Sequence, residues 1–320
     1  MIHAVFLSWH DHRRSRELAQ LLAVPFVVLR KSHLRLANPW YQVFCTIVYL
    51  FRSRSPVVIV QNPSLILTTI ACAVAGILRK RVIQDLHSYF FLHIEKGIGL
   101  RGRIYRRLSL FCIRRAALTV VTNRELKQVV ELHRGRALVL QDVIPRFSDV
   151  PMSPSAFKRV VFVCTYSADE PVTEVIEASR SLRPEIRVLI TGRIPEWIKR
   201  SPMPENVVLT GFLSETDYLA LLRSADAVMV LTTRENTLVC GAYEGLAFNK
   251  PLILSDTKVL REYFADTAAY VRNSPSSILS GIEEVCIQGK FDEDRHAESI
   301  RRLRLNWQEA FREFRDAVNC

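Results

Sequence analysis

The sequence predicts an α/β protein made of two doubly wound parallel-sheet domains. Short apolar, β-branched stretches alternate with helical stretches along nearly all of the 320 residues. This alternation stops once, at 147–155, where Pro151 and Pro154 stand among small polar residues, and it then restarts. The length and an apolar content of 49% are sufficient for two packed cores of ordinary size.

In the first half, apolar stretches are expected to be strands, and stretches with helical periodicity are expected to be helices. The expected strands are 3–7, 26–29, 57–60, 81–84, 118–121 and 137–140. The expected helices are 12–22, 40–51, 65–78, 101–115 and 124–133. Strands that alternate with helices pair in parallel, so these elements predict a Rossmann-like sheet with helices on both faces.

The stretch 56–78 carries no charge over 23 residues, which is long enough to cross a bilayer. Gln61, Asn62 and Pro63 interrupt it, however, and Ser64 is a good N-cap for a helix. A buried strand followed by a helix is therefore the favoured interpretation, and a membrane span is the alternative.

The second half repeats the alternation. The expected strands are 159–164, 186–191, 207–209, 227–231, 252–254 and 268–271, and the expected helices are 172–182, 215–223, 238–247, 259–264 and 276–287. We expect an N-terminal domain at 1–150, a second domain at 151–290, and a terminal helical segment at 291–320 that can cross back to the first domain. In doubly wound sheets ligands bind at the carboxyl ends of the strands, so we expect the two domains to face a cleft there.

Charge is distributed unevenly along the chain. Residues 1–150 hold 23 Lys and Arg against 8 Asp and Glu, whereas residues 151–320 hold 21 against 24. A strongly basic half indicates a polyanionic partner. The stretch Arg101–Arg115 alternates arginines with apolar residues, which is typical of a helix that lies on an anionic membrane surface. The alternative is a surface helix whose apolar face packs into the core.

Several classes of site and partner are disfavoured. The seven cysteines include no Cys-x-x-Cys pair, so no zinc or redox site is expected. No helix-turn-helix, zinc-finger or RNP pattern is present, so nucleic acid is not the expected partner. The N-terminus lacks the pattern of a signal peptide. The unpaired cysteines and the lack of a signal-peptide pattern favour the cytoplasm. The basic stretch Arg101–Arg115 favours a peripheral position on the inner face of the membrane.

The stretch Leu231–Asp256 points most directly to a ligand. It is expected to form a strand end, a polar loop, a helix that opens near Thr237 and a second strand. The free N–H groups at a helix start attract a diphosphate. The carboxylate of Glu244, further along this helix, can accept hydrogen bonds from a ribose diol. The pattern indicates a sugar nucleotide, and the alternative is an ordinary crossover with solvated glutamates.

This stretch resembles the donor-site signature of GT-B glycosyltransferases, in particular the family 4 (group 1) enzymes. The match lies in Glu244-Gly245-Leu246-Ala247 and in Asn249-Lys250-Pro251. In that family seven residues separate two glutamates, but here eight residues separate Glu235 from Glu244. Either the loop has one extra residue and Glu235 acts as the first glutamate, or Asn236 takes its place.

The resemblance extends to the donor pocket of the second domain. Thr210-Gly211-Phe212-Leu213 is similar to the segment that lies along the nucleotide base. Gly192 allows a close approach of the backbone, and Arg193 can form a fork on a diphosphate. Together with Arg234 and the amides of Asn236, Thr237 and Leu238, Arg193 is expected to offset the diphosphate charge.

Two short loops of the first half carry further resemblance. Asp85-Leu86-His87 looks like the Asp-x-His element of several GT-B transferases, which implies that His87 hydrogen-bonds the transferred sugar. Asp85 would then be a general base, or it would only orient His87. The loop 8–16, with His10 and Arg14 as candidates, and the run Val60–Ser64 resemble loops of the transferases that add β-mannose to lipid-linked chitobiose.

The resemblance implies a glycosyltransferase. It would move a sugar from a UDP- or GDP-linked donor to a lipid-linked or polysaccharide-precursor acceptor at the cytoplasmic membrane face. No divalent metal is expected, since no Asp-x-Asp run is present, and no cofactor is expected besides the donor. The alternatives are a non-hydrolysing sugar-nucleotide epimerase of the same fold and a basic nucleic-acid-binding protein.

Overall fold

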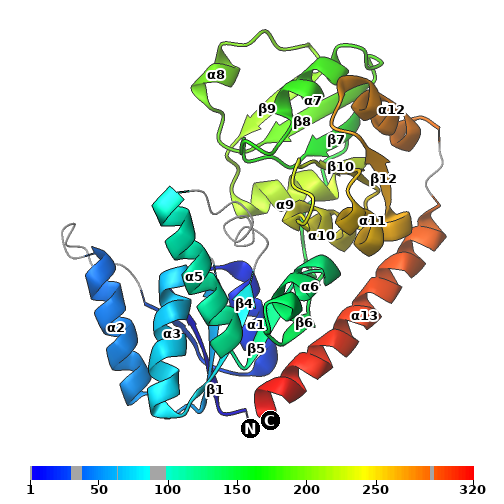
Figure 1. Ribbon diagram of the computed structural model, residues 1–320. Helices are drawn as coiled ribbons and strands as arrows, with labels where there is room; N and C mark the ends of the chain where they lie inside the picture. The colour runs from blue at the N-terminus through cyan, green and yellow to red at the C-terminus, as the bar shows by residue number, and fades with distance from the viewer. Residues whose placement is uncertain (1, 30–37, 63, 87–98, 289–291) are drawn as a thin grey trace. The chain divides into compact units, whose positions relative to one another are not determined.

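The computed structural model describes residues 2–29, 38–62, 64–86, 99–288 and 292–320. The chain divides into two compact units (Figure 1). Unit 1 consists of Met1–Asp142 together with Asn306–Cys320, and unit 2 consists of Val143–Leu305.

Unit 1 contains a parallel six-stranded sheet with the order β2-β1-β3-β4-β5-β6. Its strands are β1 Ala4–Ser8, β2 Phe26–Val28, β3 Val57–Asn62, β4 Arg81–Leu86, β5 Leu118–Val121 and β6 Ala137–Val139. The chain first moves from β1 to β2 and then crosses to β3 on the other side of β1. The sheet therefore has its topological switch between β1 and β3.

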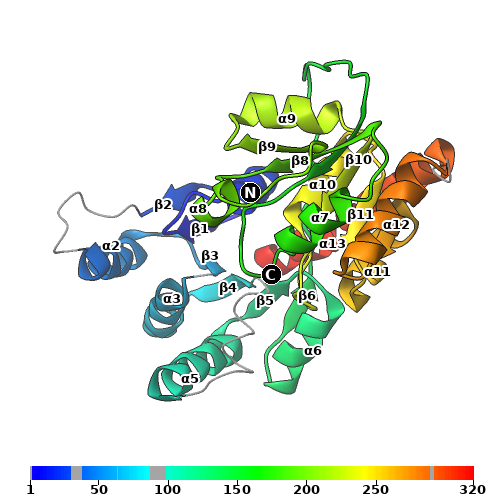
Figure 2. The ribbon, with the colours of Figure 1, turned by 90° about the horizontal axis from the view of Figure 1, so that it is seen from above.

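Helices cover both faces of this sheet. They are α1 Arg13–Leu22, α2 Asn38–Arg52, α3 Leu65–Leu78, α5 Gly99–Arg115, α6 Arg124–Leu132 and the last part of α13, Glu293–Asn319. Buried side chains of α2, α3, α5 and α6 pack with Val5, Val58 and Val82 on one face. Figure 2 shows these four helices in a row along that face. Since side chains alternate along a strand, Ile83 and Asp85 point to the other face, which α1 covers.

The charge-free stretch at 56–78 forms β3 and α3, as expected. Ser64 caps α3 by accepting a hydrogen bond from the amide of Leu67. Among the helices in the described residues, none combines the length and the apolar content that crossing a bilayer requires.

The end of α13 is fastened to unit 1 by two long-range hydrogen bonds. Trp307 Nε1 donates to the carbonyl of Gln141 at 3.0 Å, and Arg81 Nη2 donates to the carbonyl of Ala317 at 2.9 Å. Phe314, on the apolar face of the helix, is fully buried. These contacts explain why the last residues of the chain belong to unit 1.

Unit 2 repeats the architecture with the strand order β12-β11-β10-β7-β8-β9. Its strands are β7 Lys158–Phe162, β8 Ile186–Thr191, β9 Val207–Gly211, β10 Ala227–Val230, β11 Leu252–Ser255 and β12 Ala268–Val271. Its helices are α7 Val172–Ser179, α8 Glu196–Lys199, α9 Glu215–Arg223, α10 Cys240–Ala247, α11 Lys258–Phe264 and α12 Pro275–Cys286, with a short 3-10 helix η2 at Ala265–Thr267. The core on one face joins α7 and α12, and the core on the other joins α9, α10 and α11.

The two parallel sheets confirm the predicted fold class. Two details differ from the expectation. The four-residue helix α8 was not predicted, because so short a segment has no measurable periodicity. Helix α10 begins at Cys240 and not near Thr237: Val239 is extended, with φ −103° and ψ 124°, and no side chain caps the helix. Asn236, Thr237 and Leu238 therefore lie in the loop before the helix.

Candidate functional site

The loops that follow β7 and β10 are joined at the carboxyl edge of the unit 2 sheet. The Thr232 hydroxyl donates to Asp169 Oδ2 at 2.8 Å, and the Thr233 amide donates to the Asp169 carbonyl at 2.8 Å. Arg234 forms an ion pair with Asp169 at 2.9 Å. From this point one loop leads to α7 and the other to α10, on opposite faces of the sheet. This divergence is the switch point at which doubly wound sheets bind ligands.

The loop after β8 joins the same edge through Gly192. This residue has φ +101°, and a Cβ built on it would lie 2.3 Å from the carbonyl oxygen of Cys164. Only glycine fits there. The amide of Gly192 donates to the carbonyl of Gly211 at 3.2 Å, which ties in the loop after β9. The close approach predicted at Gly192 is thus made to the protein's own backbone.

Helix α10 lies unusually close to the sheet because two of its residues are glycines. A Cβ at Gly241 would lie 2.8 Å from Val163 Cγ1, and a Cβ at Gly245 would lie 2.7 Å from Leu252 Cδ2. This close packing fixes the start of the helix beside Val163, directly after β7, and fixes Gly245 beside Leu252 at the start of β11. Glu244, directly before Gly245, has a half-buried side chain.

A tyrosine from the neighbouring helix α9 orients the carboxylate of Glu244. The Tyr218 hydroxyl donates to Glu244 Oε2 at 2.5 Å. One carboxylate oxygen is therefore fixed by the protein. Hydrogen bonds to a charged acceptor are stronger than those between neutral groups, so the contact defines the orientation of the side chain.

The other candidates of unit 2 lie on loops at the same edge. Asn236, Thr237 and Leu238 are half-buried, and Glu235 is exposed in the turn before them. Arg193 is exposed after β8, with its guanidinium 6.0 Å from the centre of the Phe212 ring after β9. The structure thus gathers the predicted donor-site residues on the loops after β8, β9 and β10 and on α10. The charge of Arg234 is offset by Asp169, which leaves Arg193 as the exposed cation of this set.

In unit 1 the candidate residues Arg14 and Asp85 form a buried ion pair. Arg14 is 5% exposed and Asp85 is 1% exposed. Arg14 Nε lies 3.0 Å from Asp85 Oδ2, and Arg14 Nη2 lies 3.0 Å from Asp85 Oδ1. Arg14 also donates to Asp142 at 2.6 Å and to the carbonyl of Leu140 at 2.8 Å. The pair connects the start of α1, the end of β4 and the segment after β6.

This arrangement decides the charge of Arg14 and constrains the role of Asp85. Burial alone would lower the pKa of Arg14, but the carboxylates of Asp85 and Asp142 outweigh that effect and raise the pKa. Both oxygens of Asp85 accept hydrogen bonds from a permanent cation. The geometry therefore favours Asp85 as an orienting group over Asp85 as a general base. The exposed His10 lies in the first loop, whereas His87 and Pro63 lie outside the described residues.

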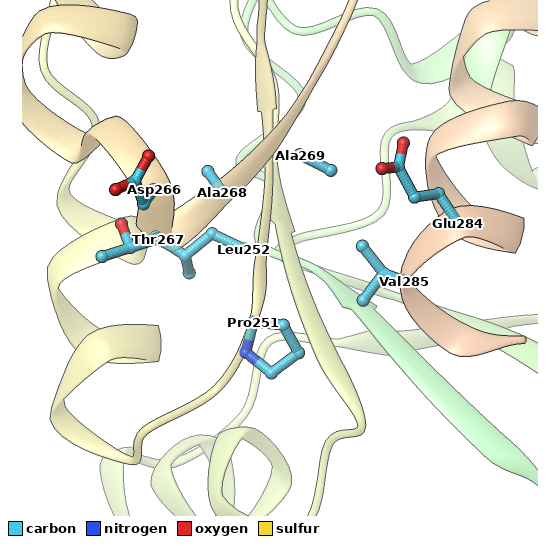
Figure 3. A pocket seen from close by; sticks show the side chains of 8 residues that line it. All are labelled: Pro251, Leu252, Asp266, Thr267, Ala268, Ala269, Glu284 and Val285. Atoms are coloured by element: carbon cyan, nitrogen blue, oxygen red, sulfur yellow. The ribbon is translucent and has the colours of Figure 1, made fainter. Parts of the chain in front are cut away.

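A metal centre and a hollow beside β11 and β12 are two further kinds of site that could bind a ligand. Within the described ranges, no group of three His, Cys, Asp or Glu side chains is arranged to hold a metal ion. A hollow between β11, β12 and α12 contains the carboxylates of Asp266 and Glu284, on either side of β12 (Figure 3). It lies near the amino ends of these strands, and Asp266 pairs with Arg295 at 3.1 Å.

A family model described as Glycosyl transferases group 1 matches residues 145–302. We call this range the group 1 domain after that match. It coincides closely with unit 2 and contains every candidate residue described for that unit. No curated protein matches the chain in sequence.

Solved structures match the whole chain, not only its group 1 domain. Sucrose-phosphate synthase from Thermosynechococcus elongatus has a TM-score of 0.69 at 14% identity, covering 96% of this chain and 94% of that one. HepE of Anabaena, solved with UDP and glucose, has a TM-score of 0.68 at 13% identity, covering 96% and 95%. A putative UDP-N-acetylglucosamine 2-epimerase from Listeria monocytogenes has a TM-score of 0.66 at 13% identity, covering 98% of each chain. The fold is GT-B.

The sequence interpretation missed three residues: Asp169 and Tyr218 of the group 1 domain, and Asp142 of unit 1. Each forms a hydrogen bond with a partner 26 or more residues away in the chain. No local pattern marks such contacts. The resemblance of the Leu231–Asp256 stretch could indicate Glu244 but not the tyrosine that holds it.

Proposed function

We propose that this protein is a glycosyltransferase that moves a sugar from a UDP- or GDP-linked donor to a lipid-linked or polysaccharide-precursor acceptor. The observation that carries the proposal is the group 1 domain, whose α10 begins beside the sheet edge where the loops after β7, β8 and β10 are tied together and carries Glu244 about one turn further along. HepE of similar fold was solved with UDP and glucose, which supports a nucleotide-sugar ligand.

In this proposal the donor is held by groups of unit 2. Glu244 accepts hydrogen bonds from the ribose, and the segment at Gly211 and Phe212 lies along the base. Arg193 and the amides of Asn236, Thr237 and Leu238 face the diphosphate. Because negative charge develops on the departing diphosphate, fixed positive groups beside it lower the barrier. Catalysis then needs no metal ion and depends mainly on orientation of the two substrates.

We assign His87 to a hydrogen bond with the transferred sugar, and we assign Glu235 or Asn236 to the position of the first family glutamate. Asp85, held by Arg14, would fix the end of β4 directly before His87. This gives Asp85 a positioning role in the reaction.

A basic and aromatic face of unit 1 supports an acceptor at a membrane surface. The arginines of α5 at 101, 103, 106 and 107 are all exposed, and Leu100 beside them is 69% exposed. On α2, Trp40 is 79% exposed and Phe44 is also exposed. Exposed apolar side chains beside cations are typical of a surface that docks on an anionic leaflet. We therefore place the protein at the cytoplasmic face of the membrane.

One second function is favoured by a specific observation. The fold is also similar to that of the putative epimerase from Listeria monocytogenes, and a fold by itself does not decide between the two reactions. Incubation with a radiolabelled nucleotide sugar separates them. An epimerase converts the sugar with no acceptor present, whereas a transferase needs membranes or an acceptor to consume the donor.

The donor site is tested by calorimetry with UDP, GDP, ADP and their sugars. We expect one base to bind best, and we expect Glu244→Ala to weaken that binding about tenfold or more, since hydrogen bonds to a charged group contribute roughly 1.5–3 kcal/mol each. Glu177→Ala, at an exposed glutamate of α7, is the control and should bind as the wild type does. Unchanged affinity of Glu244→Ala would remove the ribose role.

A further inference from the structure

A second cavity of unit 2 lies at the amino edge of its sheet, opposite to the loops after β7, β8 and β10. Its volume is about 480 Å³, which lies within the range of roughly 300–1,000 Å³ common for small-molecule sites. Lys158 at the start of β7 and Lys250 before β11 line it, and the segment 152–157 forms one wall. Lys250 belongs to the matched run Asn249-Lys250-Pro251, but the proposed transfer reaction assigns no role to this cavity.

The walls of the cavity carry more positive than negative charge. Its cations are Lys158, Arg159, Arg223 and Lys250, and its carboxylates are Asp226 and Glu185. Asp226 is already occupied by the protein. Its Oδ1 lies 3.2 Å from Lys158 Nζ, and its Oδ2 accepts the amide of Arg159 at 2.8 Å. Both oxygens of Asp226 are thus engaged by β7, although its charge still acts on Lys250.

The two arginines are held in place with donor capacity left over. Arg159 Nη2 donates to the carbonyl of Ser153, and Arg223 Nη1 donates to the carbonyl of Val150. Arg159 Nε, in contrast, is buried and has no hydrogen-bond partner in the described part of the chain. A buried donor of a charged group that stays unsatisfied costs free energy.

Lys250 adds a partly desolvated cation to the same space. Burial lowers its pKa, and the positive charges of Arg159 and Arg223 lower it further, against the opposing effect of Asp226 and Glu293. Three cations that repel one another are thus kept together by the fold. A bound anion would offset that repulsion.

We propose that this cavity binds a small anion that carries a phosphate group, with Arg159, Arg223 and Lys250 as its donors. A phosphate presents several acceptor oxygens and up to two negative charges, which suits a set of two guanidinium groups and one ammonium group. The volume leaves room for a small organic part. The site is separate from the donor site and does not depend on the proposed transfer reaction.

The test is calorimetry with inorganic pyrophosphate in the presence of saturating UDP, which occupies the proposed donor site. We expect about one equivalent to bind to the wild type and Lys250→Gln to weaken binding about tenfold or more, because a charge-assisted hydrogen bond is lost. Lys250→Arg keeps the charge and should retain binding. Lys199→Gln on α8, at an exposed lysine paired with Glu196, is the control.

Two results overturn the proposal: no binding of pyrophosphate to the wild type, or equal affinity of Lys250→Gln and the wild type. If UDP does not bind at all, the proposed donor site is at fault, and the comparison of the Lys250 variants without UDP still tests the cavity. A parallel titration with vesicles of anionic phospholipid identifies the source of the phosphate. A loss on Lys250→Gln in that arm supports a lipid headgroup, and a loss with pyrophosphate alone supports a soluble ligand.

Discussion

The hydroxyl of Tyr218 fixes one oxygen of Glu244, and this contact makes the tyrosine a positioning residue for the proposed ribose contact. In Tyr218→Phe the aromatic ring stays, but the carboxylate loses the donor at 2.5 Å and can rotate. We expect nucleotide affinity to fall about three- to tenfold, since one hydrogen bond contributes roughly 0.5–1.5 kcal/mol. Calorimetry with the preferred nucleotide measures it.

A double-mutant cycle gives the control for this prediction. In a Glu244→Ala background the tyrosine has no carboxylate to orient, so Tyr218→Phe should then cause no further loss. An equal loss in both backgrounds would show that Tyr218 acts on the ligand or on the fold and not through Glu244.

Arg14 and Arg13 stand side by side in the chain but in opposite environments. Arg14→Met would leave Asp85 as an uncompensated buried carboxylate, and removing one partner of a buried pair costs about 3–5 kcal/mol. Arg13 is partly exposed and pairs with Glu17 at 2.8 Å, so Arg13→Met should cost about 1 kcal/mol or less. Urea unfolding of the two variants measures the difference, and similar midpoints would contradict the buried-pair account.

The sequence predicts the candidate residue Glu244 better than it predicts the residues that orient the candidates. Glu244 could be recognised because its spacing to Pro251 lies within one short stretch. The partners Asp142, Asp169 and Tyr218 could not, because Arg14 and Asp142 are separated by 128 residues and only the folded chain brings them together. The sequence thus indicates which groups carry chemistry, and tertiary contacts decide how each group is oriented.

At the scale of elements, helix α5 carries the exposed arginines that we propose dock on an anionic membrane surface. Replacing Arg103, Arg106 and Arg107 with Glu removes the net positive charge of α5, and each cation near an anionic leaflet contributes about 1 kcal/mol. We expect the variant to stay in solution when anionic vesicles are sedimented, while the wild type sediments with them at low salt.

The charge-matched control for α5 lies on α13. Arg302, Arg312 and Arg315 are exposed there, and replacing them with Glu changes the net charge by the same amount. If this variant also leaves the vesicles, net charge and not the face of α5 explains the attraction. If neither variant leaves them, α5 is not the docking element.

Apolar periodicity predicted the regular elements well, because each buried strand and each amphipathic helix carries its own pattern. This periodicity did not predict the first residue of helix α10. Its apolar pattern extends to Leu238, but Val239 remains extended and the helix starts at Cys240. Gly241, the second residue of the helix, packs closely on Val163, which is a tertiary contact that a single sequence does not reveal.

At the scale of the whole molecule, the two-sheet architecture could be predicted but the strand order could not. The alternation of strands and helices implies parallel strands. The pairing of β1 with β3 and of β7 with β10 depends on which connection reverses direction along the sheet. The switch points that follow from this order decide which loops meet. The meeting of the β7 and β10 loops at Asp169 is therefore a property of the topology.

Unit 2 also contains a buried histidine, and we expect the stability of unit 2 to depend on pH because of it. His296 is 3% exposed on α13, and burial lowers its pKa from 6.5 to about 4. Below pH 6.5 the unfolded chain binds a proton that the folded unit does not bind until about pH 4. The free energy of unfolding must therefore fall as the pH falls through this window, by up to about 3 kcal/mol at roughly 1.4 kcal/mol for each pKa unit.

Chemical unfolding between pH 4 and pH 7.5 tests this linkage. In His296→Leu the titrating group is absent, so we expect a flatter dependence of unfolding free energy on pH, whatever the stability of the variant at pH 7.5. A variant of the exposed His10, His10→Leu, should keep the wild-type slope. If His296→Leu and the wild type lose stability in parallel on acidification, other groups account for the effect and His296 is protonated in the folded state.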